Sequence, residues 1–444
     1  MKKTTLILGF LFLIVKLAVA QDSTFHKLKG TIGINSEFSY KMLEPNQNLR
    51  KVSILLDEKK KGTLKEGNLV VGISMIALAD YQKSNTDSKF AYLMRHPTSN
   101  NQIGKDVSEA VIHSFQASFT GAVTNWLTVY AEMLYNPEQS FGQGTITALT
   151  RNQLQLRKGF IVFGDLDKFP IYGAIGKMDA PFGQTGSVSP FTNSTMWHAF
   201  GGLGYGAQIG FKKGGINVVF MAVQGGAQFR AMHTPVGNAS NAPSKLNNFT
   251  ADLNYTLHIN DNIDFLLGAS YLHGSAYCQD FPVTHFSSCE KNNPANTVYA
   301  TLSSKRLILQ GAYAITADVW EGTHNPNPPL DIFAASKVSS LDFGIKYNLS
   351  LEGKIIYALS GEFSNFRAGA KDSPWERQNQ IVLGLSAMIN NSSKLFVELF
   401  NTQGYSPLNF ISGSNPLQPF AVGETHSLRS ASSNGIVLGG QITF

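Results

Sequence analysis

Long apolar segments, charged side chains and cysteines are all scarce in this chain of 444 residues. After residue 20, no stretch of about 20 residues is free of charged and strongly polar side chains, which excludes spanning helices there. Charged residues make up 15% of the sequence, against about 25% in soluble domains. The chain also has no Gly-x-Ser-x-Gly elbow, Cys-x-x-Cys pair or phosphate-binding loop. The local signatures of hydrolases, dithiol redox proteins and nucleotide enzymes are therefore missing.

The two cysteines are Cys278 and Cys289. In an oxidising compartment, they predict one disulfide that closes a short loop. A metal site that includes His285 is the alternative, and it is disfavoured because metal ligands normally show tighter spacing. We expect no metal and no cofactor.

Residues 1–20 have the layout of a secretory signal peptide. Lys2 and Lys3 precede an apolar stretch at 6–15, and Ala-Val-Ala at 18–20 forms a small-residue cleavage site. An uncleaved anchor is the alternative, but the stretch is shorter than the roughly 20 residues that a spanning helix needs. Removal takes away three lysines and no acid, so the net charge falls from +6 to +3. So small a charge does not indicate a nucleic-acid partner.

The final segment, 434–444, alternates apolar side chains with polar or small ones and ends on Phe444. A strand points successive side chains to opposite faces, so this segment predicts a strand with one apolar face. The ending resembles the C-terminal insertion signal of bacterial outer-membrane barrels. Phe444 therefore predicts a location in the bacterial outer membrane, with membrane lipid and the barrel-insertion machinery as partners.

The same alternation recurs along most of the chain, for example at 250–258, 341–349 and 355–363. A soluble sandwich is the alternative, but the signal peptide and Phe444 favour a membrane barrel. Short turns alternate with long connections, which predicts an all-β transmembrane antiparallel β-barrel of about 16 strands over residues 67–444, with its short turns in the periplasm. The expected strand starts lie near 68, 108, 126, 148, 169, 202, 215, 246, 262, 296, 306, 337, 354, 378, 394 and 433.

Residues 21–66 do not follow this pattern. Leucine and valine side chains at near-helical spacing within 46–61 predict a short helix in a periplasmic N-terminal segment. Residues 31–40 could instead form an additional strand. No globular insert of about 100 residues precedes the barrel, so the plug of the larger energy-coupled transporters is not expected. We therefore expect solutes to cross the barrel by a passive or facilitated route.

Two stretches carry a family resemblance. Residues 55–64, with 69–72 and 79–81, resemble the entry segment of the legiobactin-receptor type of siderophore porin. Residues 169–183 resemble the same family and are also similar to phosphate-selective-type porins. The resemblance implies a barrel of about sixteen strands that takes up a ferric siderophore without the usual plug. After Gly183 the family continues with an Asp-Pro segment, whereas this chain has Ser-Val-Ser-Pro-Phe-Thr at 187–192.

Charged residues on the polar side of the strands are predicted to line the lumen, where they would set ion selectivity. Arg157 and Lys177 fall on neighbouring strands and are expected to form a basic patch for anionic solutes. Ion pairs that only stabilise the barrel are the alternative for every member. The set is Glu132, Arg157, Lys177, Asp252, His258, Asp264, Asp342, Lys346 and Glu362.

The connection 180–201 is a candidate constriction. Pro181 and Gly183 provide bends, and Phe182 and Trp197 could anchor the segment inside the barrel. A surface lid is the alternative.

These features predict an outer-membrane porin for passive or facilitated uptake of small solutes. The resemblance suggests a ferric siderophore as the specific solute. A general or anion-selective diffusion porin is the alternative. A barrel hydrolase or an adhesin is disfavoured, and no enzymatic activity is expected, because no local signature joins the candidate histidines to a nucleophile. These histidines are His198, His233, His273 and His324. The sequence sets no oligomeric state.

Overall fold

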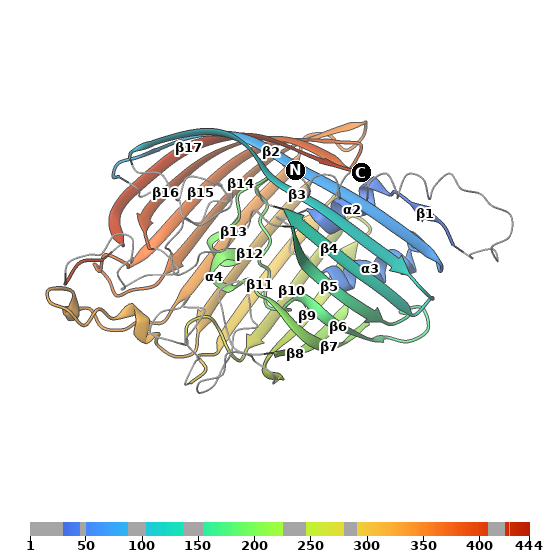
Figure 1. The fold of residues 1–444 in the computed structure, drawn as a ribbon, viewed down its shortest axis with the longest axis horizontal. Coiled ribbons are helices and arrows are strands. Elements are labelled where there is room, and N and C mark those ends of the chain that lie inside the picture. Colours follow the sequence, from blue (N-terminus) through green and yellow to red (C-terminus); the bar gives the residue numbers. More distant parts are fainter. Residues whose placement is uncertain are drawn as a thin grey trace, which may run out of the picture. The chain divides into compact units, whose positions relative to one another are not determined.

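A ring of sixteen long strands makes up the chain's main architecture (Figure 1). The computed structural model describes residues 30–44, 50–87, 104–135, 154–224, 246–278, 291–406, 422–425 and 427–444. Residues from Ile32 to Phe444 form one unit. The strands are β2 Asn68–Ser84, β3 Asp106–Ala122, β4 Leu127–Tyr135, β5 Gln155–Phe163, β6 Ile171–Asp179, β7 Leu203–Lys213, β8 Ile216–Gln224, β9 Leu246–Asn260, β10 Ile263–Leu272, β11 Ala295–Ser304, β12 Leu307–Thr316, β13 Ser339–Asn348, β14 Ile355–Arg367, β15 Arg377–Ile389, β16 Ser393–Tyr405 and β17 Leu428–Thr443.

The ring is closed by antiparallel pairing of β17 with β2, in which Ser433 lies opposite Ser84 and Thr443 opposite Ser74. Phe444 extends this pairing, because its N–H donates to the Ile73 carbonyl at 3.0 Å and receives the reverse bond at 2.6 Å. All sequential neighbours from β2 to β17 are antiparallel. The predicted antiparallel barrel of about sixteen strands is confirmed. Only β5 and β17 begin more than two residues from their expected starts.

Strand β5 begins at Gln155 rather than near 148, and residues 148–153 lie outside the described residues. A bulge in β5 interrupts the alternation of its side chains. Glu132 lies opposite Lys158, but Met133 lies opposite Leu156, which leaves Arg157 as the extra residue. Lys158 is therefore buried on the inner face, and its Nζ lies 2.6 Å from Asp179 Oδ2.

The two faces of the barrel differ as the alternation predicts. On β15, Ile381, Leu383 and Leu385 are 44%, 56% and 45% exposed on the outer face. Gln378 and Gln380 are buried on the inner face. An outer face of this kind suits contact with hydrocarbon, and a polar inner face suits contact with water. Separately, no helix among the described residues is long and apolar enough to cross a membrane.

Tight turns join the strands at one end of the barrel. Asn390 and Asn391 have φ values of 49° and 56° between β15 and β16, and Gly214 and Gly215 have 59° and 84° between β7 and β8. Two successive positive φ values are typical of the hairpin turn that matches the twist of paired strands. The antiparallel order places these turns at the same end as Phe444, which we call the short-turn end.

Ahead of the barrel strands lie β1 Ile32–Gly33, α2 Ser36–Leu43 and α3 Lys51–Lys60. The alternative of a full strand at 31–40 is wrong, since only β1 pairs, in parallel, with Leu69 and Val70 of β2. The side chain of Asn35 accepts the Phe38 N–H at 3.0 Å. An asparagine in this position caps a helix, so the chain turns into α2 instead of continuing as a strand.

Both helices lie inside the barrel (Figure 1, blue). A Cβ on Gly72, which faces inward from β2, would lie 2.5 Å from Ser39 Oγ of α2. Leu55 and Leu56 of α3 are buried in one cluster with Tyr130 of β4. The expected periplasmic helix is therefore an internal one. An amphipathic helix must bury its apolar side, and the inner faces of these strands provide the apolar contacts.

Leu55 is fully buried, so Leu55→Ala should loosen α3. Truncation of a buried leucine costs about 2–5 kcal/mol because it leaves a cavity. When both proteins are measured in lipid vesicles, amide hydrogen exchange across residues 51–60 should be faster in the variant than in the unmodified protein. The barrel strands should keep their protection. Leu395→Ala is the matched control, since Leu395 is 55% exposed on the outer face. Equal exchange in the two variants would contradict the internal position of α3.

Candidate functional site

The connection between β6 and β7 folds into the lumen. Gly183 N–H donates to Ser270 Oγ of β10 at 2.9 Å. Gln310 of β12 donates to the Gly186 carbonyl at 2.7 Å, and Thr195 N–H donates to Ser364 Oγ of β14 at 3.1 Å. The segment then ends in the helix α4 Thr195–Phe200. These bonds run to inward-facing side chains on β10, β12 and β14, so the segment lies along the inner face and is not a surface lid.

Two buried carboxylates hold the middle of this internal loop. Glu362 accepts the Val188 and Ser189 N–H groups at 2.7 and 3.2 Å. Glu398 accepts the Phe191 N–H at 2.5 Å, the Thr192 N–H at 3.1 Å and the Thr192 hydroxyl at 2.6 Å. Each side chain therefore accepts hydrogen bonds from two consecutive loop residues. The two carboxylates therefore fix the path of the loop backbone across β14 to β16.

Glycines on the barrel strands make room for the loop. A Cβ on Gly344 of β13 would lie 2.6 Å from Val188 Cγ2. A Cβ on Gly384 of β15 would lie 2.5 Å from Pro190 Cδ. A side chain at either position would displace the loop towards the centre of the lumen.

Ion pairs tie α3 to β4 and β7. Lys51 forms a short contact with Glu132 of β4, and its Nζ also lies 3.4 Å from the Tyr130 hydroxyl. Burial lowers the pKa of Lys51 to about 8, against the opposing effect of Glu132. Lys212 of β7 contacts both carboxylate oxygens of Asp57 at 2.7 Å. The helix is therefore held by charge at its first turn and again near its last.

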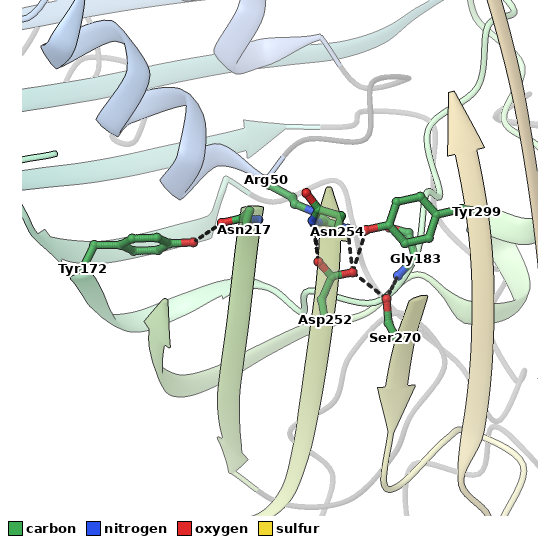
Figure 2. A network of polar contacts seen from close by, with 8 residues as sticks. All are labelled: Arg50, Tyr172, Gly183, Asn217, Asp252, Asn254, Ser270 and Tyr299. Carbon is green, nitrogen blue, oxygen red and sulfur yellow. Dashed lines mark hydrogen bonds and ion pairs between the residues drawn. The ribbon is translucent and has the colours of Figure 1, made fainter. Parts of the chain in front are cut away.

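Arg50, just before α3, enters a network around Asp252 of β9 (Figure 2). Its guanidinium contacts the two carboxylate oxygens at 2.5 and 2.9 Å. The hydroxyls of Ser270 and Tyr299 donate to the same carboxylate at 2.6 and 2.7 Å. Arg50 also donates to the Gly183 carbonyl at 3.2 Å. One guanidinium thus connects the internal helix, the internal loop and the barrel strands.

A cavity of 1180 Å³ remains between these internal elements and the strands from β7 to β16. Loop residues 184 and 186–190 line it at one side, and turn residues such as Lys168 and Gly214 line it at the short-turn end. It exceeds the roughly 300–1,000 Å³ of a typical small-molecule site. Its charged lining residues are Arg50, Lys60, Lys168, Lys212, Lys213, Lys346 and Lys394, with Glu44, Asp57 and Asp167.

The structure brings four predicted acids into the interior. Glu132, Asp252 and Glu362 hold the internal elements, and Asp342 accepts the Gln310 amide at 3.1 Å. Asp264 instead lies near a turn, where it is exposed and contacts His258 at 2.6 Å. For the first three, the contacts fit the alternative reading of ion pairs and hydrogen bonds that stabilise the barrel.

The two members of the predicted basic patch, Arg157 and Lys177, have different surroundings. Arg157 faces inward, with its Nε 3.8 Å from Glu132 Oε1. Lys177 shares the outer side of β6 with Ile175 and packs 5.4 Å from the ring centre of Tyr205, which is 44% exposed. The lumen position expected for Lys177 is therefore wrong. On β6 both faces carry apolar residues, so polarity alone did not identify the inner one.

The predicted constriction residues belong to the internal loop. Pro181, Phe182 and Gly183 are buried, Phe182 packs 6.0 Å from the ring of Phe200, and Trp197 is partly buried. Their effect on pore width stays a prediction. Cys278 is disulfide-bonded, and Cys289 lies outside the described residues.

Sequence reasoning missed Arg50, Lys51, Glu398, Lys394 and Glu44. Glu398 and Lys394 lie on the inner side of β16, where the rule of alternation could have found them. Arg50, Lys51 and Glu44 had no such signal, because they precede the strands and their partners lie 202, 81 and 350 residues away.

Comparison with known proteins agrees with this geometry. An anion-selective porin from Comamonas acidovorans superposes with a TM-score of 0.50 and 12% identity, covering 85% of this chain and all of that one. The chain has the fold of outer-membrane porins. A location in the bacterial outer membrane is consistent with this fold and with the apolar outer face.

Sequence comparison is less informative. No family model matches. A UPF0422 protein from Coxiella burnetii is 23% identical over 192 residues, which is 42% of this chain and 38% of that protein. OprB of Pseudomonas putida has a TM-score of 0.49 at 8% identity, covering 84% of this chain and 94% of its own.

Glu398→Gln should release part of the internal loop. The substitution keeps the shape of the side chain but removes the charge, and a hydrogen bond to a charged group contributes about 1.5–3 kcal/mol. Single-channel recordings should show more frequent current fluctuations than the unmodified protein. Glu352→Gln, at an exposed turn, is the control. Recordings that match the control would mean that Glu398 does not hold the loop.

Arg50→Met should destabilise the interior, because the Asp252 side chain is 0% exposed and would keep an uncompensated charge. Loss of one partner of a buried pair costs about 3–5 kcal/mol. Denaturant titration in vesicles should show the loss, and Arg50→Met with Asp252→Asn should recover most of it. A double variant no more stable than the single one would show that Arg50 acts by packing alone.

Proposed function

We propose that the protein is a diffusion porin for small polar solutes. One observation carries the proposal: a closed barrel with an inward-folded loop leaves a cavity, lined by both charged and apolar residues, that extends from the short-turn end to the loop. A sixteen-stranded barrel is wide enough to enclose an aqueous channel. The route would follow the side from β8 to β16, since α2 and α3 pack against the inner face elsewhere.

Two proposals for the solute have different support. Uptake of a ferric siderophore is supported by the sequence resemblance at 55–64, 69–72, 79–81 and 169–183. General diffusion of small solutes requires only the cavity and the internal loop. The internal helices do not decide between the two, because they occupy far less of the chain than the plug of an energy-coupled transporter.

Single-channel conductance in a planar bilayer tests both the porin function and the identity of the solute. Steady open current is expected from the refolded full chain. Block by micromolar ferric siderophore would support the siderophore form, and open current without block would support general diffusion. Complete absence of current from correctly folded protein would overturn the porin proposal and favour an occluded enzyme or an adhesin.

A further inference from the structure

The acidic residues of the lumen cavity are mostly neutralised, whereas several of its cations are not. Glu44 contacts Lys394 Nζ at 2.9 Å, and Asp57 contacts Lys212 at 2.7 Å. Asp167 is exposed in the turn between β5 and β6. The uncompensated charge that faces the cavity is therefore positive.

Lys346 is the inner member of this positive set. It lies on the inner face of β13, is half-buried and lines the cavity. No residue in the described parts of the chain forms an ion pair or hydrogen bond with its ammonium group. Lys394 of β16 also lines the cavity, but its ammonium group is paired with Glu44 at 2.9 Å.

A hydroxyl without a partner lies beside Lys346. Ser360 of β14 is directly opposite Lys346 in the strand register. Its Oγ is buried and has no hydrogen-bond partner in the described part of the protein. Side chains directly opposite on paired strands have Cβ atoms about 4.5–5.5 Å apart. The ammonium group and the hydroxyl can therefore approach one ligand from the same side of the cavity.

We propose that Lys346 and Ser360 form an anion-binding subsite for a small carboxylate or phosphate solute. The ammonium group supplies a point charge and up to three donors, and the hydroxyl supplies one more. Lys60 and Lys213 are exposed lining residues at the short-turn end, where they attract anions towards the opening. This subsite rests on the proposed diffusion function and specifies its solute class.

Bilayer recordings with Lys346→Gln test the subsite. The full chain should prefer chloride over potassium in a salt gradient, and its current should be blocked by inorganic phosphate or by succinate. In Lys346→Gln the half-blocking concentration should rise about tenfold, which corresponds to about 1.4 kcal/mol, because the charged donor to the anion is lost. Stronger block by one anion than by the other identifies which chemistry the site prefers.

Lys177→Gln is the matched control, because it removes the same charge from the outer face. Lys346→Arg should keep the block, and Ser360→Ala should weaken it without loss of ion preference, so the test survives if Lys346→Gln does not fold. Open channels whose block is unchanged in both Lys346→Gln and Ser360→Ala would overturn the subsite and leave the porin function intact. No current from the unmodified chain would instead overturn the porin function.

Discussion

Four buried carboxylates on the inner face of the barrel determine what can lie inside it. Glu132 and Asp252 bind cations at the start of α3, and Glu362 and Glu398 bind backbone N–H groups of the internal loop. A buried carboxylate is costly unless it is paired and hydrogen-bonded. The strands and the internal elements therefore depend on each other: each supplies the partners that the other's buried polar groups require.

This arrangement also determines the charge of the passage. Acids that hold internal elements contribute little field to the open part of the lumen. By contrast, Lys346 holds no internal element in the described part of the chain, and Lys60 and Lys213 are exposed. The inward-facing residues include both acids and bases. Because most of the acids are paired, the lumen can nevertheless present mainly positive charge to a solute.

The outer face of the barrel could be predicted from sequence because lipid imposes a strict alternation on every strand. The interior could not, because its polarity depends on what lies against it. Val219 and Met221 of β8 and Tyr172 of β6 face inward, yet they are apolar and belong to the same buried cluster as Leu55 of α3. The apolar residues on both faces of β8 are therefore a consequence of the internal packing, and the same holds for the ambiguity of β6 around Lys177. Strands that are apolar on both faces in an otherwise alternating barrel indicate an internal element.

The two internal elements reach the middle of the barrel from opposite ends. The chain leads from α3 into β2 at the short-turn end, and the internal loop leaves β6 and returns to β7 at the other end. They meet where Arg50 donates to the Gly183 carbonyl at 3.2 Å, and both contact Ser270 or its carboxylate partner Asp252. A shift of the helix would remove one support of the loop, and a shift of the loop would remove one acceptor of Arg50. In the proposed porin, the width of the passage would therefore depend on both segments, which are 133 residues apart in sequence at this contact. For that reason, neither segment alone could have indicated the width.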